Sequence, residues 1–213
     1  MRRVFASAAG LCGILLVVVS ATALGEHRRC APGASDTLTG SRDVRLYRTR
    51  DGFLAGCRFS TGRMRILDES GWFPPPAMDA ARTLVAFVSI DTDGVGFGPP
   101  TLIVEDLARP LARPVVRSFE IGDVGILRVT RRGAVAWIEC EDDSEEPTAI
   151  SPSCRRINSF KRVYKRDSSG AGRAADANVL VDEGRGIDIR SLGLRGGRVT
   201  WEKRGRQRSA AIQ

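Results

Sequence analysis

The sequence has only one histidine, His27, in 213 residues. Catalysis by Ser–His–Asp or Cys–His groups needs an imidazole, and so does an ordinary histidine-ligated zinc site. His27 falls in a stretch that we interpret below as an N-terminal tail. We therefore do not expect these chemistries, and we predict that no substitution of His27 matters.

Sequence signals for cofactors and metals are lacking as well. The chain has no Gly-Lys-Ser/Thr run of the Walker type, and its glycine-rich segment Gly94–Gly98 leads into Pro99 and Pro100 instead of a helix. We interpret that segment as a flexible turn and not as a nucleotide-binding loop. No two cysteines have the C-x-x-C spacing of a zinc site. The sequence therefore predicts no cofactor and no metal centre.

Aromatic residues and lysines are scarce. Aromatics make up 6% of the chain, and only three of its 33 basic residues are lysine. The arginines are scattered singly and in pairs, without interleaved aromatics, so we do not expect a nucleic-acid partner. The formal net charge of +8 has two interpretations: an anion-binding surface, or a coding preference for arginine wherever a soluble cation is needed.

The first 25 residues have the pattern of a signal peptide. Arg2 and Arg3 precede an apolar stretch at 4–24, and Ala21-Thr22-Ala23 supplies a small-x-small cleavage pattern. A retained membrane anchor is the alternative, since about 20 apolar residues can span a bilayer. We expect cleavage near Glu26, an N-terminal tail at 26–40, and a secreted protein.

A short pattern recurs four times and indicates repeated β units. Its copies follow polar or glycine-rich turns, at spacings of 41, 50 and 64 residues: Val44–Tyr47, Val85–Val88, Val135–Ile138 and Val199–Glu202. Repeats of about 40–50 residues are typical of blade-type β architectures, in which one unit buries its face against the next. Trp137 and Trp201 occupy the same place in two of the copies, which favours core packing over binding.

Period-two alternation places strands in four successive units. The expected strands are 43–49, 53–59 and 63–68; 77–81, 83–90, 101–107 and 114–120; 124–130, 134–140, 160–166 and 178–182; and 190–195, 198–203 and 207–212. The predicted fold class is therefore all-β, a propeller-like array of about four antiparallel blade units over residues 41–213. Unit one lacks its first strand and unit four its last, so we expect an incomplete or strand-shared ring.

Four cysteines remain after removal of the signal peptide, an even number that suits an oxidising compartment. Three pairings are possible. We predict Cys30–Cys57 and Cys140–Cys154, because each of these pairs falls within one repeat unit.

One unit resembles a known family. Residues 75–89, followed by Leu102–Leu107, are similar to a blade of TolB-like or WD40-like β-propellers, with Met78-Asp79-Ala80-Ala81 in place of the family's Ser-Pro-Asp-Gly turn. The whole chain also resembles secreted propeller-like repeat proteins of high-GC bacteria. The resemblance implies a fold, and it carries no catalytic residues over to this chain.

Candidate ligand-binding residues lie in predicted loops. Trp72 and Phe73 form a potential aromatic platform, although they could equally pack between blades. Asp91 and Asp93 resemble the start of a calcium loop, but the twelfth position, where a bidentate Glu is needed, is Leu102. The remaining candidates belong to the acidic run from Glu139 to Glu146, whose alternative interpretation is a solvated loop: Glu141, Asp142 and Asp143.

Charge is expected to divide between the two ends of the molecule. Successive antiparallel strands reverse direction, so turns of one kind emerge at one end and turns of the other kind at the opposite end. Arg63, Arg82, Arg109, Arg131 and Arg195 belong to one set, whereas most of the acidic loop residues belong to the other. The second set has exceptions in two basic loops, at Arg48 and Arg50 and at Arg204 and Arg206.

We expect a secreted binding or scaffold module that uses its loop faces, and not an enzyme. Its partner would be an extracellular protein, a glycan or another cell-surface ligand. The alternative is an extracellular hydrolase of glycans, because a carboxylate pair at fixed separation suffices for that chemistry.

Overall fold

The computed structural model describes residues 30, 37–69, 77–90, 99–110, 115–141, 154, 158–168 and 177–213. These residues include 15 strands in four antiparallel sheets, so the all-β prediction is confirmed. Among the residues described, no helix has the length and apolar character needed to cross a membrane.

Each sheet is a meander in which consecutive strands pair. Sheet A contains β1 (Thr37–Gly40), β2 (Val44–Arg48), β3 (Leu54–Arg58) and β4 (Arg63–Asp68). Sheet B contains β5 (Met78–Ala81), β6 (Leu84–Ser89), β7 (Thr101–Asp106) and β8 (Val115–Glu120). Sheet C contains β9 (Val124–Val129), β10 (Val135–Cys140), β11 (Lys161–Arg166) and β12 (Val179–Gly184). Sheet D has three strands, β13 (Ile187–Arg195), β14 (Arg198–Lys203) and β15 (Arg206–Ala211).

Local sequence sets the tight turns of these meanders. In sheet D both hairpins close with two residues of positive φ, Gly196 and Gly197 in the first and Arg204 and Gly205 in the second. Positive φ at both central positions is the geometry that matches the twist of two-residue hairpins, and glycine adopts it without a steric cost.

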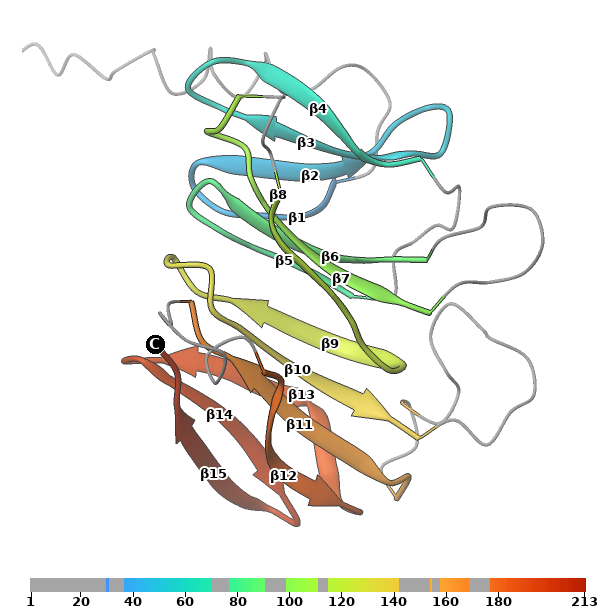
Figure 1. The fold of residues 1–213 in the computed structure, drawn as a ribbon, viewed down its shortest axis with the longest axis vertical. Helices are drawn as coiled ribbons and strands as arrows, with labels where there is room; N and C mark the ends of the chain where they lie inside the picture. The colour runs from blue at the N-terminus through green and yellow to red at the C-terminus, as the bar shows by residue number, and fades with distance from the viewer. Residues whose placement is uncertain are drawn as a thin grey trace, which may run out of the picture.

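The sheets follow one another in chain order, with A and D at opposite ends of the row (Figure 1). The first strand of each sheet contributes to the contact with the next sheet: β1 meets β5, β5 meets β9, and β9 meets β13. The core accordingly forms layers between neighbouring sheets. Val44, Leu46 and Val85 lie between A and B, Trp137 is buried between B and C, and Trp201 between C and D. The core position predicted for both tryptophans is confirmed.

The two ends of the row differ in chemistry. Val199 and Trp201 of β14 face sheet C, so side chains on the other face of sheet D point away from the row. That outer face carries Arg198, Thr200 and Glu202, with Gln207, Ser209 and Ala211 beside them in β15. A polar outer face is what caps a stack of repeats. The outer face of sheet A is apolar instead, with the cluster Cys30, Tyr47, Ala55, Cys57 and Phe59.

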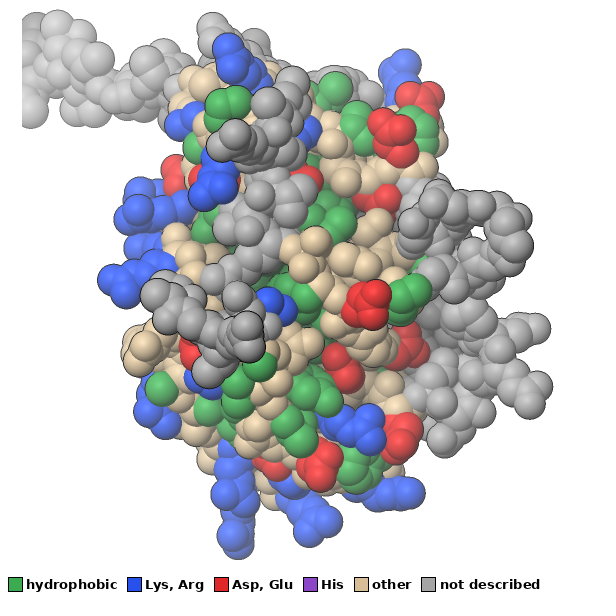
Figure 2. Space-filling view, in the orientation of Figure 1, with side chains coloured by type: hydrophobic (Ala, Val, Ile, Leu, Met, Phe, Trp, Pro, Cys, Tyr) green, Lys and Arg blue, Asp and Glu red, His purple; other side chains and the backbone are tan. Residues whose placement is uncertain are grey.

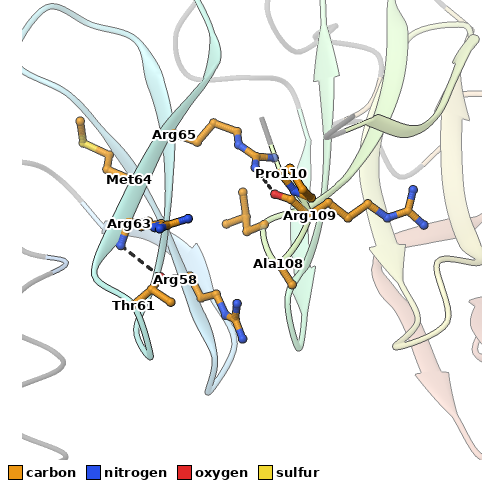
Figure 3. A pocket seen from close by; sticks show the side chains of 9 residues that line it. Arg58, Thr61, Arg63, Met64, Arg65, Ala108, Arg109 and Pro110 are labelled. Carbon is orange, nitrogen blue, oxygen red and sulfur yellow. Dashed lines mark hydrogen bonds between the residues drawn. The ribbon is translucent and has the colours of Figure 1, made fainter. Parts of the chain in front are cut away.

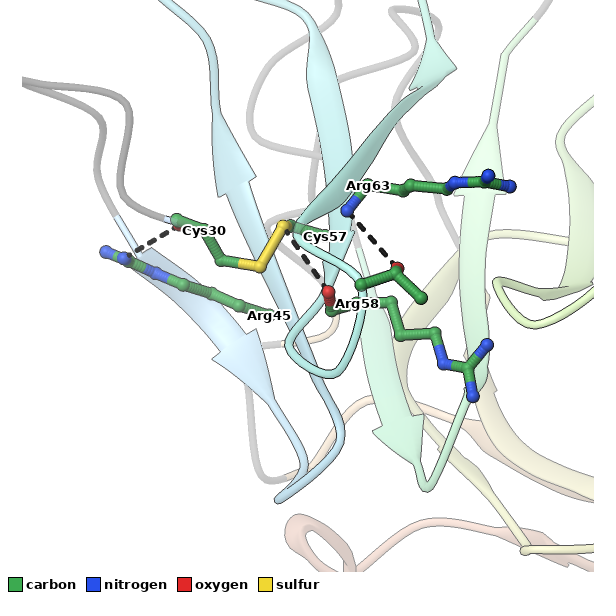
Figure 4. Close-up of a disulfide and its surroundings, with 6 residues drawn as sticks. Cys30, Arg45, Cys57, Arg58 and Arg63 are labelled. Atoms are coloured by element: carbon green, nitrogen blue, oxygen red, sulfur yellow. Dashed lines mark hydrogen bonds between the residues drawn. A yellow bond between two sulfur atoms is a disulfide. The ribbon is translucent and has the colours of Figure 1, made fainter. Parts of the chain in front are cut away.

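Both predicted disulfides are present. The Cys30–Cys57 disulfide joins the segment before sheet A to β3, with a Cα–Cα distance of 5.5 Å. The Cys140–Cys154 disulfide joins the last residue of β10 to Cys154, with a Cα–Cα distance of 5.2 Å. Nη1 of Arg45 donates a hydrogen bond of 3.2 Å to the backbone oxygen of Cys30 (Figure 4). The other terminal nitrogen of Arg45 donates to Thr37, so one side chain holds both Cys30 and β1.

The prediction that unit one lacks a first strand is wrong. β1 lies within the stretch 26–40 that we expected to be a tail, and it pairs with β2 from Thr37↔Tyr47 to Gly40↔Arg45. Its four residues, Thr-Leu-Thr-Gly, are too few for alternation to identify a strand. Unit four does have three strands, although its first begins at Ile187 instead of 190. The two ends of the chain therefore do not complement each other as expected.

Candidate anion-binding site at the arginine-rich end

The turns of the four meanders emerge at two opposite ends of the sheets, as antiparallel pairing requires. We call the end with the β1–β2, β3–β4, β5–β6, β7–β8, β9–β10, β11–β12 and β13–β14 turns the arginine end. The described arginines in or beside these turns are Arg42, Arg58, Arg63, Arg82, Arg109, Arg131, Arg132, Arg166, Arg195 and Arg198. Figure 2 shows Lys and Arg side chains along the left edge of the view, where these turns emerge, and also at its lower edge, whereas acidic side chains lie mainly over the right half.

The opposite end has more acidic residues, but the separation is incomplete. Its described acidic residues are Asp51, Asp68, Glu69, Glu120, Asp123, Glu141, Asp182, Glu183 and Asp188. Arginines interrupt this end at Arg48, Arg50, Arg185, Arg204 and Arg206. The arginine end also has acidic residues, at Asp43, Asp106 and Asp167. The predicted charge division therefore holds as an excess of each sign and not as a complete sorting.

A cavity of about 460 Å³ opens at the arginine end between sheets A and B (Figure 3). The β3–β4 hairpin forms one wall and the β7–β8 turn the other. Leu107, Ala108 and Pro110 give it apolar surface, and four arginines line it: Arg58, Arg63, Arg65 and Arg109.

Strand register brings Arg58 and Arg63 together. They lie directly opposite each other where β3 pairs with β4, and Arg58 also lies opposite Val44, which is buried against sheet B. Cross-strand neighbours share one face of a sheet, so both arginines project toward sheet B. Figure 4 shows the two side chains extending to the same side. Like charges directly opposite each other destabilise a sheet, and an anion between them would remove that cost.

Two of the four arginines already have partners. Arg65 Nη1 lies 3.3 Å from Glu105 Oε2 of β7, and Arg65 Nη2 donates a hydrogen bond of 2.7 Å to the backbone oxygen of Arg109. Arg109 Nε lies 3.9 Å from Asp106 Oδ2. Burial raises the pKa of Glu105, and the hydrogen bond and charge of Arg65 oppose that rise. Arg65 therefore joins sheet A to sheet B.

Arg58 and Arg63 differ from Arg65 and Arg109. In the described part of the chain, neither guanidinium has an acidic partner or a side-chain hydrogen bond. Thr61, at the hairpin tip between them, accepts a hydrogen bond from the backbone N–H of Arg63, which leaves its hydroxyl hydrogen available to donate. Two guanidinium forks and a hydroxyl on one apolar-backed cavity are donors that suit a carboxylate, phosphate or sulfate group.

A second basic cavity, of about 680 Å³, lies at the same end beside the β9–β10 and β13–β14 turns. It is lined by Arg131 and Arg132 from the first turn and by Arg195 and Arg198 around the second. Arg198 donates to the Ser209 hydroxyl at 2.8 Å, so that side chain is held in place by β15. The arginine end therefore presents two separate basic cavities.

Most of the candidates from sequence fall outside the described residues: Trp72, Phe73, Asp91, Asp93, Asp142 and Asp143. Glu141 is described and exposed, at the end opposite the arginine cavities. It lies 3.6 Å from Arg162, which also lies 3.7 Å from Glu183, so Glu141 belongs to a surface ion-pair network. Within the described ranges, no group of three or more His, Cys, Asp or Glu residues could hold a metal ion.

Sequence reasoning assigned Arg63 and Arg109 to this end of the molecule, but it did not identify Arg58 or the cavity. A local signal was present, because Arg58 and Arg63 flank a short Phe-Ser-Thr-Gly hairpin turn. Two arginines that flank a hairpin turn are cross-strand neighbours when the register is regular. The facing wall, from Leu107 to Pro110, is more than 40 residues away in sequence, so only the packing of sheet B on sheet A brings it close.

The fold and the site thus define an all-β protein of four antiparallel sheets with two basic cavities at one end. No protein-family model matches the chain, and no curated protein matches it. Among solved structures it is similar to the crystal structure of the computationally designed Ika8 protein, with 13% sequence identity and a TM-score of 0.37. The match covers 84% of this chain, and the chain spans 57% of the length of the designed one.

Proposed function

We propose that the protein is an exported, non-enzymatic binding module that attaches to an acidic cell-surface glycan through its arginine end. The observation that carries the proposal is the facing pair Arg58 and Arg63, two guanidinium groups on one cavity wall that have no acidic partner among the described residues. Arginine presents a planar fork that matches carboxylate and sulfate oxygens, so the pair suits a ligand with repeated anionic groups.

The location outside the cytoplasm rests on the cysteines. Two disulfides indicate an oxidising, extracellular-type environment, in which such bonds form and persist. Residues 1–25 would direct the export, as a signal peptide that is removed.

The architecture supports a scaffold role. We propose that the four sheets are blades of an incomplete, propeller-like array, in which sheet D ends the row with its polar outer face. The packing of sheets through their first strands brings the strand ends of the arginine end to one side of the molecule. A rigid backbone beneath these arginines reduces the conformational freedom lost on binding, which favours recognition of a repetitive polyanion.

The two basic cavities favour the binding module over the hydrolase alternative. Neither of the two cavities has an acidic lining residue, whereas glycoside hydrolysis needs two carboxyl groups at the scissile bond.

The test measures binding to an immobilised polyuronate, with neutral dextran as the comparison ligand. We expect the wild-type protein to bind the polyuronate, and binding to weaken as salt rises past about 0.1 M, where the Debye length is about 10 Å. The double variant Arg58→Ala/Arg63→Ala should lose about tenfold in affinity.

The matched control removes the same charge from the other end. Arg50 and Arg185 are exposed there, and Arg50→Ala/Arg185→Ala should change the affinity less than about twofold. The proposal is wrong if the two double variants weaken binding equally, or if dextran binds as well as the polyuronate. Arg58→Lys/Arg63→Lys separates charge from fork geometry, because lysine keeps the charge and loses the bidentate contact.

A further inference from the structure

Sheet D is one strand short of its neighbours. Sheets A, B and C each have four strands, whereas sheet D has three. In the part of the chain that the structure describes, β15 is therefore an edge strand with β14 on one side only (Figure 1). The position that β4, β8 and β12 occupy in the other sheets is open beside β15.

The hydrogen-bonding groups of this edge can be assigned from the register. All six residues of β15 pair with β14 without a bulge, from Lys203↔Arg206 to Arg198↔Ala211. A two-residue turn makes Lys203 and Arg206 a hydrogen-bonded pair, and the bond from Ile212 N to Gly197 O, 3.0 Å, fits the same alternation. Arg206, Arg208 and Ala210 therefore bond to β14, while the N–H and C=O groups of Gln207, Ser209 and Ala211 point to the open edge.

Charge decides which strand suits this edge. Arg206 and Arg208 are exposed and share the face of Trp201. A second copy of β15 would place arginines close to arginines, and such repulsion is a common protection against edge-to-edge association. A strand with acidic side chains at the facing positions would gain attraction instead.

The molecule contains an example of such a pairing. In sheet C the fourth strand, β12, pairs with β11, and Arg162 of β11 lies 3.7 Å from Glu183, directly opposite it in β12. β4 likewise ends in an acidic residue, Asp68, and β12 contains Asp182 and Glu183. Each fourth strand thus combines apolar residues with at least one carboxylate, and β12 is the one of the three without an arginine.

We propose that the edge of β15 binds an extended, acidic segment of another protein, which adds to sheet D as its fourth strand. The backbone groups of Gln207, Ser209 and Ala211 supply the ladder, and Arg206 and Arg208 select carboxylates. The site is separate from the cavity between sheets A and B that Arg58 and Arg63 line.

The probe is a peptide that copies Asn178–Gly184, capped at both ends and fluorescently labelled, and its binding to the full chain is measured by fluorescence polarisation. We expect saturable binding, and slower amide hydrogen exchange at Gln207, Ser209 and Ala211 but not at residues of β3. The same peptide with Asp182→Lys and Glu183→Lys should not bind.

Two variants at one position give the decisive comparison. The N–H of Ser209 points to the open edge and does not bond to β14. Ser209→Pro therefore removes a group that the bound strand would need without breaking the pairing of β14 with β15, and proline is tolerated at such an edge position. Ser209→Ala keeps the N–H and loses only the hydroxyl that Arg198 contacts. We expect Ser209→Pro to weaken binding at least about tenfold and Ser209→Ala less than about twofold.

Charge reversal provides an independent variant, since Arg206→Glu/Arg208→Glu should prefer the lysine peptide. The proposal is overturned if the acidic peptide does not bind, if Ser209→Pro and Ser209→Ala bind equally well, or if binding needs Arg58 and Arg63. If the acidic peptide does not bind, Arg206 and Arg208 serve only to keep the edge unpaired. Binding of the acidic peptide to Arg58→Ala/Arg63→Ala, measured beside polyuronate binding by the same variant, shows whether the edge and the cavity between sheets A and B act independently.

Discussion

The carboxylate of Asp182 in β12 accepts a hydrogen bond of 2.8 Å from the indole Nε1 of Trp201 in β14. Lys203 Nζ donates to the other oxygen of the same carboxylate at 2.7 Å. One acidic side chain of the last strand of sheet C thus holds two residues of the middle strand of sheet D. It adds a charged, specific link to the apolar layer between these sheets.

Asp182→Asn should lower the free energy of unfolding at pH 7 by about 1–3 kcal/mol, because a charge-assisted pair is lost inside a largely buried contact. Burial raises the pKa of Asp182, but the hydrogen bonds from Lys203 and Trp201 and the charge of Lys203 outweigh it, so the pKa is lowered. A lowered pKa contributes stability above the unfolded value of about 3.9, and that contribution is lost as the pH falls through the folded value.

Urea unfolding at pH 7 and at acidic pH tests this. The difference between wild type and Asp182→Asn should shrink as Asp182 becomes protonated, and Glu183→Gln, an exposed neighbour, serves as the control. An equal difference at both pH values would contradict the assignment.

Asp79 of β5 should behave in the opposite way. Its Oδ2 accepts a hydrogen bond of 2.9 Å from the backbone N–H of Val129 in β9, which links sheets B and C. Burial raises the pKa of Asp79, against the effects of the Val129 hydrogen bond and the Arg128 charge. Its contribution to stability is thus present below the unfolded pKa and lost as the pH rises through the folded value.

At pH 7 we therefore expect Asp79→Asn to be at least as stable as wild type, because an amide oxygen keeps the acceptor without a buried charge. Asp79→Ala should cost about 1–3 kcal/mol, since the Val129 N–H loses its partner. Thermal unfolding of both variants gives the comparison, and equal losses in the two would show that the charge itself is needed.

Arg65 and Glu105 are expected to depend on each other. Their side chains are 11% and 9% exposed. Removing one partner of a buried ion pair leaves a charge uncompensated, so Arg65→Ala should destabilise the protein by about 3–5 kcal/mol. The double variant Arg65→Met/Glu105→Leu should recover much of this loss. Arg58→Ala, a change at the same cavity without an acidic partner, should alter stability by less than about 0.5 kcal/mol. A double-mutant cycle in urea with no coupling between Arg65 and Glu105 would refute the prediction.

The two disulfides should contribute similar amounts to stability. They close loops with sequence separations of 27 and 14. In the chain-entropy model these loops correspond to roughly 3.5 and 3 kcal/mol. We expect Cys30→Ala/Cys57→Ala and Cys140→Ala/Cys154→Ala each to lower the free energy of unfolding by about these values. A loss below about 1 kcal/mol for either pair would show that the reduced chain is already constrained there.

Much of the fold could be read from local patterns. Residues 77–88 have enough helix-forming residues to allow a helix, yet the repeated Val-x-aromatic pattern predicted a turn and a strand, and the structure has the β5–β6 hairpin there. The disulfide pairing was also accessible, because it needed only the assignment of each cysteine to a repeat unit. Strand β1 could not be predicted from sequence, because its four residues are too few to show a pattern. Arg45 binds Thr37 of β1 and the backbone of Cys30, and such contacts leave no local sequence signal.

By itself, the sequence determined every strand except β1, the approximate boundaries of the four sheets and the excess of arginine in one set of turns, because alternation and turn composition are properties of neighbouring residues. Only the tertiary structure decided which arginines share a cavity and which carboxylates bridge sheets. These features join residues from different sheets, as Arg65 to Glu105 and Asp182 to Trp201 do. Such contacts arise from the packing of one sheet on the next, and no local pattern encodes that packing.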